Sequence, residues 1–286
     1  MSGEPARSYD YVTVGHVTAD VLIGADGAQR RQPGGGAFYS ALQAARLGLR
    51  TLVLTRGEPR ELAELLAPFA GEIDVEIAPA PQTTTMQTRG RGAARAQRLR
   101  AWAGPICAQD FAPATLPVGT SILHLAPVAR ETPPGWQCTC DFVGLTAQGL
   151  VRRWDASGGE IELAAIDRAR LPCALDAVVI SASERAFCEQ LLDAIPVMAV
   201  TAGEGPTTIH VAGEVDLRVA PRPVSGAHDD LGAGDVFAAA FFIALSDGLT
   251  PLQAAAYGNA AAAVRISGRG PDAIGSVEAI EQRLGA

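Results

Sequence analysis

The segment Asp229–Asp235, with the sequence Asp-Asp-Leu-Gly-Ala-Gly-Asp, combines carboxylates with a turn of small residues. It leads straight into an Ala-rich run that is typical of a helix. Small residues let backbone N–H groups approach a ligand, and the free N–H groups at a helix start favour an anion. Asp235 at this point fits a base that deprotonates a hydroxyl while the N–H groups stabilise a phosphoryl group in transfer. The alternative is a structural helix start, with Asp235 at the positive end of the helix dipole.

Two segments near the N-terminus also carry residues suited to binding a polar ligand. Gly34-Gly35-Gly36 precedes a helical run, and Asp20 follows the first predicted strand closely. Backbone amides at Gly34 and Gly35 can reach a ligand, and the Asp20 carboxylate can accept hydrogen bonds from two of its hydroxyls. The structural alternatives are a flexible loop for the glycines and a turn or cap role for Asp20.

These three segments resemble, in order and spacing, the motifs of the ribokinase-like (PfkB) family of sugar and nucleoside kinases, and the resemblance runs through nearly the whole chain. It implies that Asp235 is the catalytic base and that Gly232, Ala233 and Gly234 form the anion hole. It also implies that Asp20, Gly34 and Gly35 bind the substrate. Segments such as Thr83–Thr85 and Gln148–Arg152 are similar to the inositol-kinase-like branch.

The resemblance extends to the phosphoryl donor. It implies ATP and Mg²⁺ as cofactors, with the nucleotide phosphates at a turn and the adenine beside a later helix. The implied donor-binding residues are Thr201, Gly203, Gly205, Asn259 and Ala263. Glu184 falls on a position that helps to place Mg²⁺, and Asp229 on one that in some members touches a monovalent cation such as K⁺.

Several residues depart from the family pattern. Ser181 stands at an Asn position and Pro206 at a Gly position, while Asp230-Leu231 replaces hydroxyl residues. Tyr39 replaces an Asn after the glycines, which we expect to reshape the substrate pocket. Arg89, together with Arg91 and Arg95, lies where a phosphate or an acidic substrate would be contacted; the alternative is a set of solvated charges.

Composition narrows the possible functions. The 286-residue chain is 48% hydrophobic, which is ample for a core, and its formal net charge of −8 with no long basic run argues against nucleic-acid binding. No hydrophobic signal core or membrane-spanning run is present, so a cytoplasmic protein with no membrane partner is expected. All 23 basic residues are arginine, which excludes a P-loop lysine and Schiff-base chemistry.

Short apolar runs alternate with helical stretches along the chain. The runs are continuous rather than alternating, as strands covered on both faces require, and the order predicts a doubly wound, mostly parallel α/β sheet. Strands are expected at 11–17, 51–55, 122–128, 141–145, 177–181 and 197–201. Helices are expected at 36–47, 58–69, 146–154, 159–168, 184–193, 234–247 and 251–266.

Two stretches do not follow this alternation, about 20–33 and 83–102. The first contains Gly24–Gly27, which resembles a hairpin turn, and the second is polar and arginine-rich. In ribokinase-like proteins a small β-lid is built from these two places, so we expect a lid inserted in one domain over residues 1–286. The alternative is two ordinary surface hairpins.

The sequence therefore predicts an ATP-dependent kinase acting on a hydroxyl of a small polyol or sugar, as a monomer or a homodimer. A catalytically inactive sugar- or nucleotide-binding protein on the same fold is the alternative, motivated by Ser181, Pro206 and Asp230-Leu231.

Overall fold

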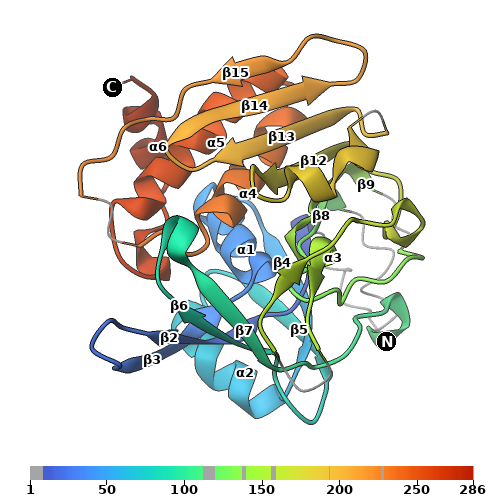
Figure 1. Cartoon of the computed structure of the whole chain (residues 1–286), viewed down its shortest axis with the longest axis vertical. Helices are drawn as coiled ribbons and strands as arrows, with labels where there is room; N and C mark the ends of the chain where they lie inside the picture. The colour runs from blue at the N-terminus through green and yellow to red at the C-terminus, as the bar shows by residue number, and fades with distance from the viewer. Residues whose placement is uncertain are drawn as a thin grey trace, which may run out of the picture.

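The computed structural model describes residues 9–111, 120–136, 140–155, 159–192, 194–226 and 229–285. A large twisted sheet carries helices, and a smaller sheet projects from it (Figure 1). Apart from a short third pair of strands, these two sheets contain every strand of the described residues. The large sheet places the ends of distant segments side by side, and the small sheet covers them.

The main sheet has nine strands in the order β15-β14-β13-β12-β9-β8-β1-β4-β5. All neighbours from β13 to β5 run parallel, whereas β14 and β15 pair antiparallel at one edge. Its strands are β1 (Tyr9–Val14), β4 (Thr51–Gly57), β5 (Asp74–Pro79), β8 (Thr120–Leu125), β9 (Cys140–Thr146), β12 (Ala177–Ser181), β13 (Val197–Ala202), β14 (Gly205–Val211) and β15 (Leu217–Val219). The carboxyl ends of the parallel strands therefore share one edge, where open α/β sheets bind ligands.

Long helices cover one face of this sheet. The strand residues on that face, such as Ala177, Val179 and Ala199, pack against Phe237 and Phe241 of α4. The helices are α1 (Gly36–Arg46), α2 (Pro59–Leu66), α4 (Ala233–Ser246), α5 (Pro251–Ile266) and α6 (Val277–Gly285). Because α4 lies between the sheet and its neighbouring helices, its residues from Val236 to Ala244 are all buried.

The opposite face is covered by short elements, which corrects part of the sequence prediction. A helix expected at 146–154 is limited to α3 (Gln148–Val151). The helix expected at 159–168 is absent, because β11 (Glu162–Leu163) pairs instead with β10 (Arg152–Arg153). The helix expected at 184–193 is replaced by two 3₁₀ turns at 185–187 and 189–191. These segments still bury apolar side chains, among them Val151, Ile166 and Leu191.

The small sheet has four strands in the order β3-β2-β6-β7. They are β2 (Thr18–Ile23), β3 (Gln29–Gly34), β6 (Thr85–Arg89) and β7 (Ala96–Ala101), and they come from the two stretches in which the lid is predicted. β2 and β6 run parallel and join the two hairpins, so the segments form one sheet rather than two separate hairpins. Within the described residues, no helix combines the length and the apolar character needed to cross a membrane.

Glu131 explains why two strands end earlier than the sequence predicts. β1 ends at Val14 and β8 at Leu125, although the apolar runs continue to residues 17 and 128. The N–H of His16 and that of Val128 each donate to Glu131 Oε1 at 2.8 Å, and the N–H of Ala129 donates to Oε2 at 2.6 Å. These amides are bound to a fully buried carboxylate instead of a neighbouring strand, so the chain turns away from the sheet.

We expect Glu131→Ala to lower the free energy of unfolding by about 3 kcal/mol or more, because it leaves three backbone N–H groups without their acceptor. Urea unfolding would measure the change. Glu64→Gln, on the exposed part of α2, is the control and should change stability little. A loss below about 1 kcal/mol for Glu131→Ala would contradict this role.

Candidate active site

Two carboxylates meet the glycine segment that links β3 to α1. A Cβ added at Gly34 would stand 2.1 Å from Oδ2 of Asp20, and one added at Gly36 would stand 3.0 Å from Oδ1 of Asp235. The absence of side chains at these two glycines therefore makes room for both carboxylates. Gly35 lies between them with φ of 92°, in the left-handed region that favours glycine. Residues 20, 34–36 and 235, which are distant in sequence, form one site.

The turn before α4 places backbone N–H groups at the same site. Gly232 is the N-cap of α4 with φ of 77°, and a Cβ added there would lie 2.4 Å from the ring of Tyr39. Both the backbone conformation and the contact therefore require glycine. The first turn of α4, with Ala233, Gly234 and Asp235, has N–H groups without intrahelical acceptors, which favours an anion at this position. The N–H of Ala233 donates to the carbonyl of Asp230 at 3.3 Å, just before the helix.

Burial changes the acidity of both carboxylates. Burial raises the pKa of Asp20 to about 7, against a hydrogen bond from Thr18 Oγ1 at 2.7 Å and the charges of Arg152 and Arg95. Burial also raises the pKa of Asp235 to about 6, and the charge of Arg152 opposes this shift. A carboxylate with a pKa near 6 is ionised at neutral pH yet accepts a proton readily, as a general base requires.

Arg152 is a site residue that the sequence analysis did not single out individually. It is buried, and its guanidinium donates to the carbonyl of Val128 at 2.9 Å and to Oε1 of Gln97 at 2.8 Å. The two acceptors fix the side chain beside a small cavity of about 40 Å³ that Asp20 and Asp235 also line. The available signal was its place in the segment Gln148–Arg152, which carries the likeness to the inositol-kinase-like branch.

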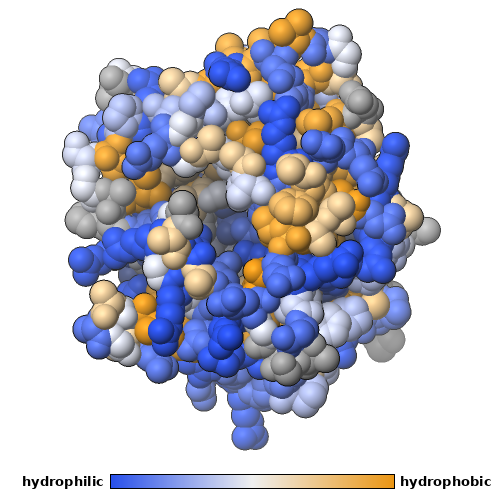
Figure 2. Space-filling view, in the orientation of Figure 1, coloured by the Kyte–Doolittle hydropathy of each residue, from blue (hydrophilic) through white to orange (hydrophobic). Residues whose placement is uncertain are grey.

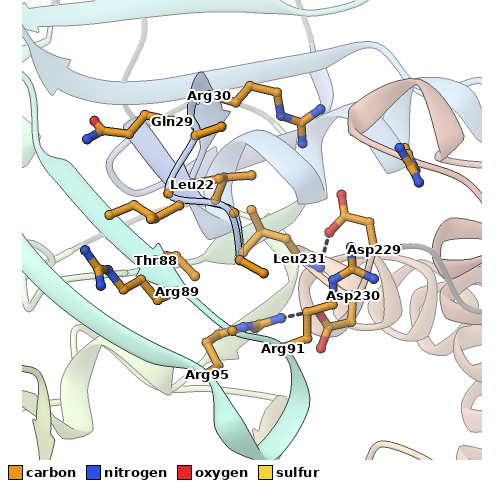
Figure 3. Close-up of a pocket in the computed structure, with 17 residues that line it drawn as sticks. Leu22, Gln29, Arg30, Thr88, Arg89, Arg91, Arg95, Asp229, Asp230 and Leu231 are labelled. Atoms are coloured by element: carbon orange, nitrogen blue, oxygen red, sulfur yellow. Dashed lines mark hydrogen bonds and ion pairs between the residues drawn. The ribbon is translucent and has the colours of Figure 1, made fainter.

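The lid sheet covers a second, larger cavity of about 930 Å³ (Figure 3). Arg89 lines this larger cavity and not the small one, and its side chain points away from Asp229 and Asp230. Arg95 lines both cavities. In the orientation of Figure 1, this face of the molecule is hollowed and bordered largely by hydrophilic side chains (Figure 2).

Asp230 ties the lid to the turn before α4. Its Oδ2 accepts the N–H of Gly92 at 2.9 Å, and its Oδ1 accepts NH2 of Arg95 at 2.5 Å (Figure 3). Gly92 and Arg95 belong to the turn between β6 and β7, so the lid tip is held two residues before Gly232. This departure from the family pattern thus has a structural role, which is to fasten the lid over the site.

The acidic residues implied in cation binding lie in different surroundings. Glu184 is buried, and its Oε2 accepts the N–H of Ser181 at 2.7 Å, which leaves its second oxygen for a ligand. Asp229 instead contacts the guanidinium of Arg265. Among the described residues, no three His, Cys, Asp or Glu side chains gather as a metal site. Mg²⁺ fits Glu184 nevertheless, because it needs only one or two carboxylates when phosphates and water complete its shell.

The residues implied in nucleotide binding fall into two groups. Thr201, one residue before the end of β13, pairs with Ser181 of β12, and Gly203 lies in the tight turn to β14, which begins at Gly205. This turn is close to Glu184 at the carboxyl edge of the sheet. Asn259 and Ala263 of α5 are buried. Asn259 Oδ1 accepts Thr207 Oγ1 at 2.8 Å and its Nδ2 donates to the carbonyl of Ala220 at 3.4 Å, so its amide packs α5 against its neighbours.

Tyr39 lies deep in this region. Its ring is 1% exposed and packs against Gly232, and its hydroxyl accepts Nε2 of Gln32 at 3.1 Å. The ring also lines the small cavity. Tyr39 therefore packs against the turn before α4 and forms part of the wall of the small cavity.

We expect Asp20→Asn to stabilise the protein at high pH. The folded protein holds a proton on Asp20 up to pH about 7, whereas the unfolded chain loses it near 3.8, so wild-type stability falls as pH rises between these values. The variant lacks this cost and should be more stable at pH 8 by about 1–3 kcal/mol, and by less at pH 5. Urea unfolding at both pH values measures it, and lower stability of the variant at pH 8 would contradict it.

Breaking the lid contact should loosen the lid without unfolding the protein. In Asp230→Ala, we expect amide hydrogen exchange over residues 90–101 to become about tenfold faster, because a charge-assisted contact is worth about 1–2 kcal/mol. Asp26→Ala is the matched control, since Asp26 at the other lid turn bonds the N–H of Ala28 within its own hairpin. Equal exchange over residues 90–101 in Asp230→Ala and wild type would overturn the proposed fastening.

Comparisons with known proteins bear on the family and on the fold. Residues 181–277 match the model of the family described as pfkB family carbohydrate kinase. The matched region includes the turn between β13 and β14, the turn before α4 and both α4 and α5. No curated protein sequence matches the chain.

Solved structures with a similar fold cover nearly the whole chain. A pyrophosphate-dependent kinase in the ribokinase family, complexed with a pyrophosphate analog and myo-inositol, has a TM-score of 0.75 at 19% identity and covers 95% of this chain and 99% of its own. Arabidopsis thaliana ribokinase complexed with ribose and ATP has a TM-score of 0.72 at 17% identity, with 98% and 100% covered. The nucleoside kinase of Methanocaldococcus jannaschii has a TM-score of 0.68 at 14% identity, with 96% and 98% covered.

At these identities the structural likeness concerns the fold, and the family match concerns the segment that holds the anion-binding turn and Asp235. The chain thus has the ribokinase-like fold and carries, in residues 181–277, the domain signature of the pfkB family of carbohydrate kinases.

Proposed function

We propose that this protein is a kinase that transfers the γ-phosphoryl group of Mg·ATP to a hydroxyl of a small polyol or sugar. The observation that carries the proposal is the placement of Asp20 and Asp235 against the Gly34–Gly36 segment, at the N-terminus of α4. The similar structures add support, because two of them are complexes with myo-inositol and with ribose.

The substrate binds in the small cavity beneath the lid. Asp20 accepts hydrogen bonds from its hydroxyl groups. Glycine at positions 34 and 35 lets this segment pack tightly against Asp20 and the backbone of His16, which keeps its peptide groups beside the substrate. The cavity of about 40 Å³ has room for only about three water molecules, so the lid must move to admit the substrate. Closure also excludes water, which protects the donor from hydrolysis during transfer.

Asp235 acts as the base in the transfer. One substrate hydroxyl gives its proton to the Asp235 carboxylate as its oxygen attacks the terminal phosphorus of the donor, and the bond to the leaving phosphate breaks. The N–H groups of Gly232, Ala233 and Gly234 stabilise the charge on the phosphoryl oxygens. Arg152 and Arg95 add positive charge at the same place, which the chain supplies with arginine because it has no lysine.

Glu184 would hold Mg²⁺ through its free carboxylate oxygen, directly or through water, at the side of the site where β12 and β13 end. When bound, the ion neutralises phosphate charge during transfer. Thr201, Gly203 and Gly205 would contact the donor phosphates beside it.

Inorganic pyrophosphate is a second candidate donor, and one observation favours it. Asn259 and Ala263, which the family pattern places beside adenine, are buried, and the Asn259 amide already has two partners. A donor without a base would not need that surface. Three of the similar structures are described as pyrophosphate-dependent kinases.

Asp235→Asn should lower kcat/KM by about 10²–10⁴ because the variant has no base. The test incubates wild type and variant with Mg²⁺ and either ATP or pyrophosphate, across inositols, pentoses, hexoses, sugar acids and nucleosides. Substrate-dependent release of ADP or of phosphate identifies the donor. Asp247→Asn, at the exposed far end of α4, is the control and should remain active.

The pH profile gives an independent check of the base. Asp235 works only when ionised, so wild-type kcat/KM should be retained above its pKa and lost as pH falls through about 6. Asp20, which binds the substrate and has a pKa of about 7, titrates in both proteins, so the residual kcat/KM of Asp235→Asn should fall less steeply below pH 6 than that of the wild type. Full activity of the variant would sink the mechanism. Binding of ATP without turnover of any substrate would favour the catalytically inactive binding protein instead.

A further inference from the structure

The side chain of Arg265 forms a buried cation beneath the turn that precedes α4. Arg265 belongs to the last turn of α5 and its side chain is 0% exposed. Its guanidinium donates through NH2 to Oδ2 of Asp229 at 3.1 Å and to the carbonyl of Leu231 at 2.7 Å, and through NH1 to the carbonyl of Asp229 at 3.3 Å. One carboxylate and two carbonyl oxygens therefore converge on a single positive charge.

This arrangement does not fit a monovalent cation at Asp229. Such an ion needs oxygen ligands, and these oxygens already bind the positively charged guanidinium. The remaining capacity of the carboxylate is also used, since Oδ1 accepts the N–H of Leu231 at 3.0 Å and Oδ2 that of Gly270 at 3.1 Å. A second cation beside the buried guanidinium would meet like-charge repulsion at low dielectric.

The guanidinium also fixes the peptide group that enters the anion hole. In a trans peptide the C=O and the N–H point in opposite directions, so holding the Leu231 carbonyl sets the direction of the Gly232 N–H. The guanidinium carbon lies 5.6 Å from the centre of the Tyr39 ring, and that ring packs against Gly232. Arg265 thus holds the Leu231–Gly232 peptide on the side opposite to the Gly232 N–H, and Tyr39 packs against Gly232.

We infer that Arg265 is a built-in cation that takes the place of the K⁺ ion implied at Asp229, and that it positions the anion-hole peptide at Gly232. Phosphoryl transfer by this protein then needs no monovalent cation. The part concerning transfer rests on the function proposed above. The part concerning the cation depends only on the folded structure. It can be tested by the melting temperature, which requires no turnover.

The first experiment uses the wild-type protein, with KCl replaced by tetramethylammonium chloride at equal ionic strength. We expect kcat to agree within about twofold and the melting temperature to show no K⁺-specific shift. Saturable activation by K⁺ of more than about fivefold, or a K⁺-specific rise in melting temperature, would overturn the inference.

The second experiment removes the charge with Arg265→Met. Misplacement of the Gly232 peptide should lower kcat about 10²-fold, with a smaller change in KM. K⁺ should then raise both kcat and the melting temperature of this variant, because Asp229 and the two carbonyls become free to bind it, whereas tetramethylammonium should not. Arg265→Lys, which keeps a charge, should retain activity without K⁺.

Arg46→Met is the matched control for the loss of a structural arginine. Arg46 of α1 donates to the carbonyls of Pro271, Asp272 and Ile274, in the loop after α5, and does not bind the turn before α4. The Arg46→Met variant should lose stability, but K⁺ should change neither its kcat nor its melting temperature. An equal K⁺ response in Arg46→Met and Arg265→Met, or none in Arg265→Met, would contradict the inference. If Arg265→Met does not fold, the wild-type comparison decides, and if no substrate is phosphorylated, the melting temperatures decide.

Discussion

Two carboxylates are held out of water at the carboxyl edge of the main sheet, and their charge has to be balanced inside the protein. Burial raises the pKa of Asp20 to about 7 and that of Asp235 to about 6; a neighbouring carboxylate adds to each shift, and the charges of nearby arginines oppose it. The glycine segment from Gly34 to Gly36 makes the space, because any side chain at its ends would overlap a carboxylate. Most other features of the site follow from keeping these acids in place.

Arginines supply the positive charge at the site, and oxygen acceptors anchor the guanidinium of each. Arg152 is held by the carbonyl of Val128 and by Gln97, and Arg265 by Asp229 and Leu231. The planar guanidinium can bind two or three acceptors in a fixed geometry, which a lysine ammonium on a flexible stem does less well. A chain without lysine can therefore still build a rigid, positively charged site.

The two sheets have different roles. The main sheet is buried on both faces and fixes the ends of β1, β8, β12 and β13 at one edge. The tip of the lid sheet is held by the partly exposed pair of Asp230 and Arg95. This contact is worth about 1–2 kcal/mol, which is small beside the stability of a folded domain, so it can break and re-form while the rest of the protein stays folded. That property suits a lid that must admit a substrate.

How much of this could be foreseen from the sequence depends on the range of the interaction involved. The continuous apolar runs correctly indicated a mostly parallel sheet, and the long helices α1, α4 and α5 lie within one or two residues of their expected bounds. The strands β5, β14 and β15 and the helix α6 were not predicted, since they are short, partly exposed or begin at Gly-Pro and so carry weak periodicity. The helix expected at 159–168 was wrong because pairing with Arg152 and Arg153 overrides local propensity.

The site divides in the same way. Residue types and their local spacing were enough to predict the Gly-Ala-Gly turn into α4, the glycine segment and the acids Asp20 and Asp235. These features depend on backbone chemistry and residue type within a few neighbouring positions. The residues that surround this turn, the glycine segment and the two acids became apparent from the tertiary packing alone. Glu131 at the strand ends, Arg152 beside the carboxylates, Asp230 on the lid and Arg265 beneath the anion hole all act on residues far along the chain. Their partners are set by how strands and helices pack, and no local pattern in a single sequence encodes that distance.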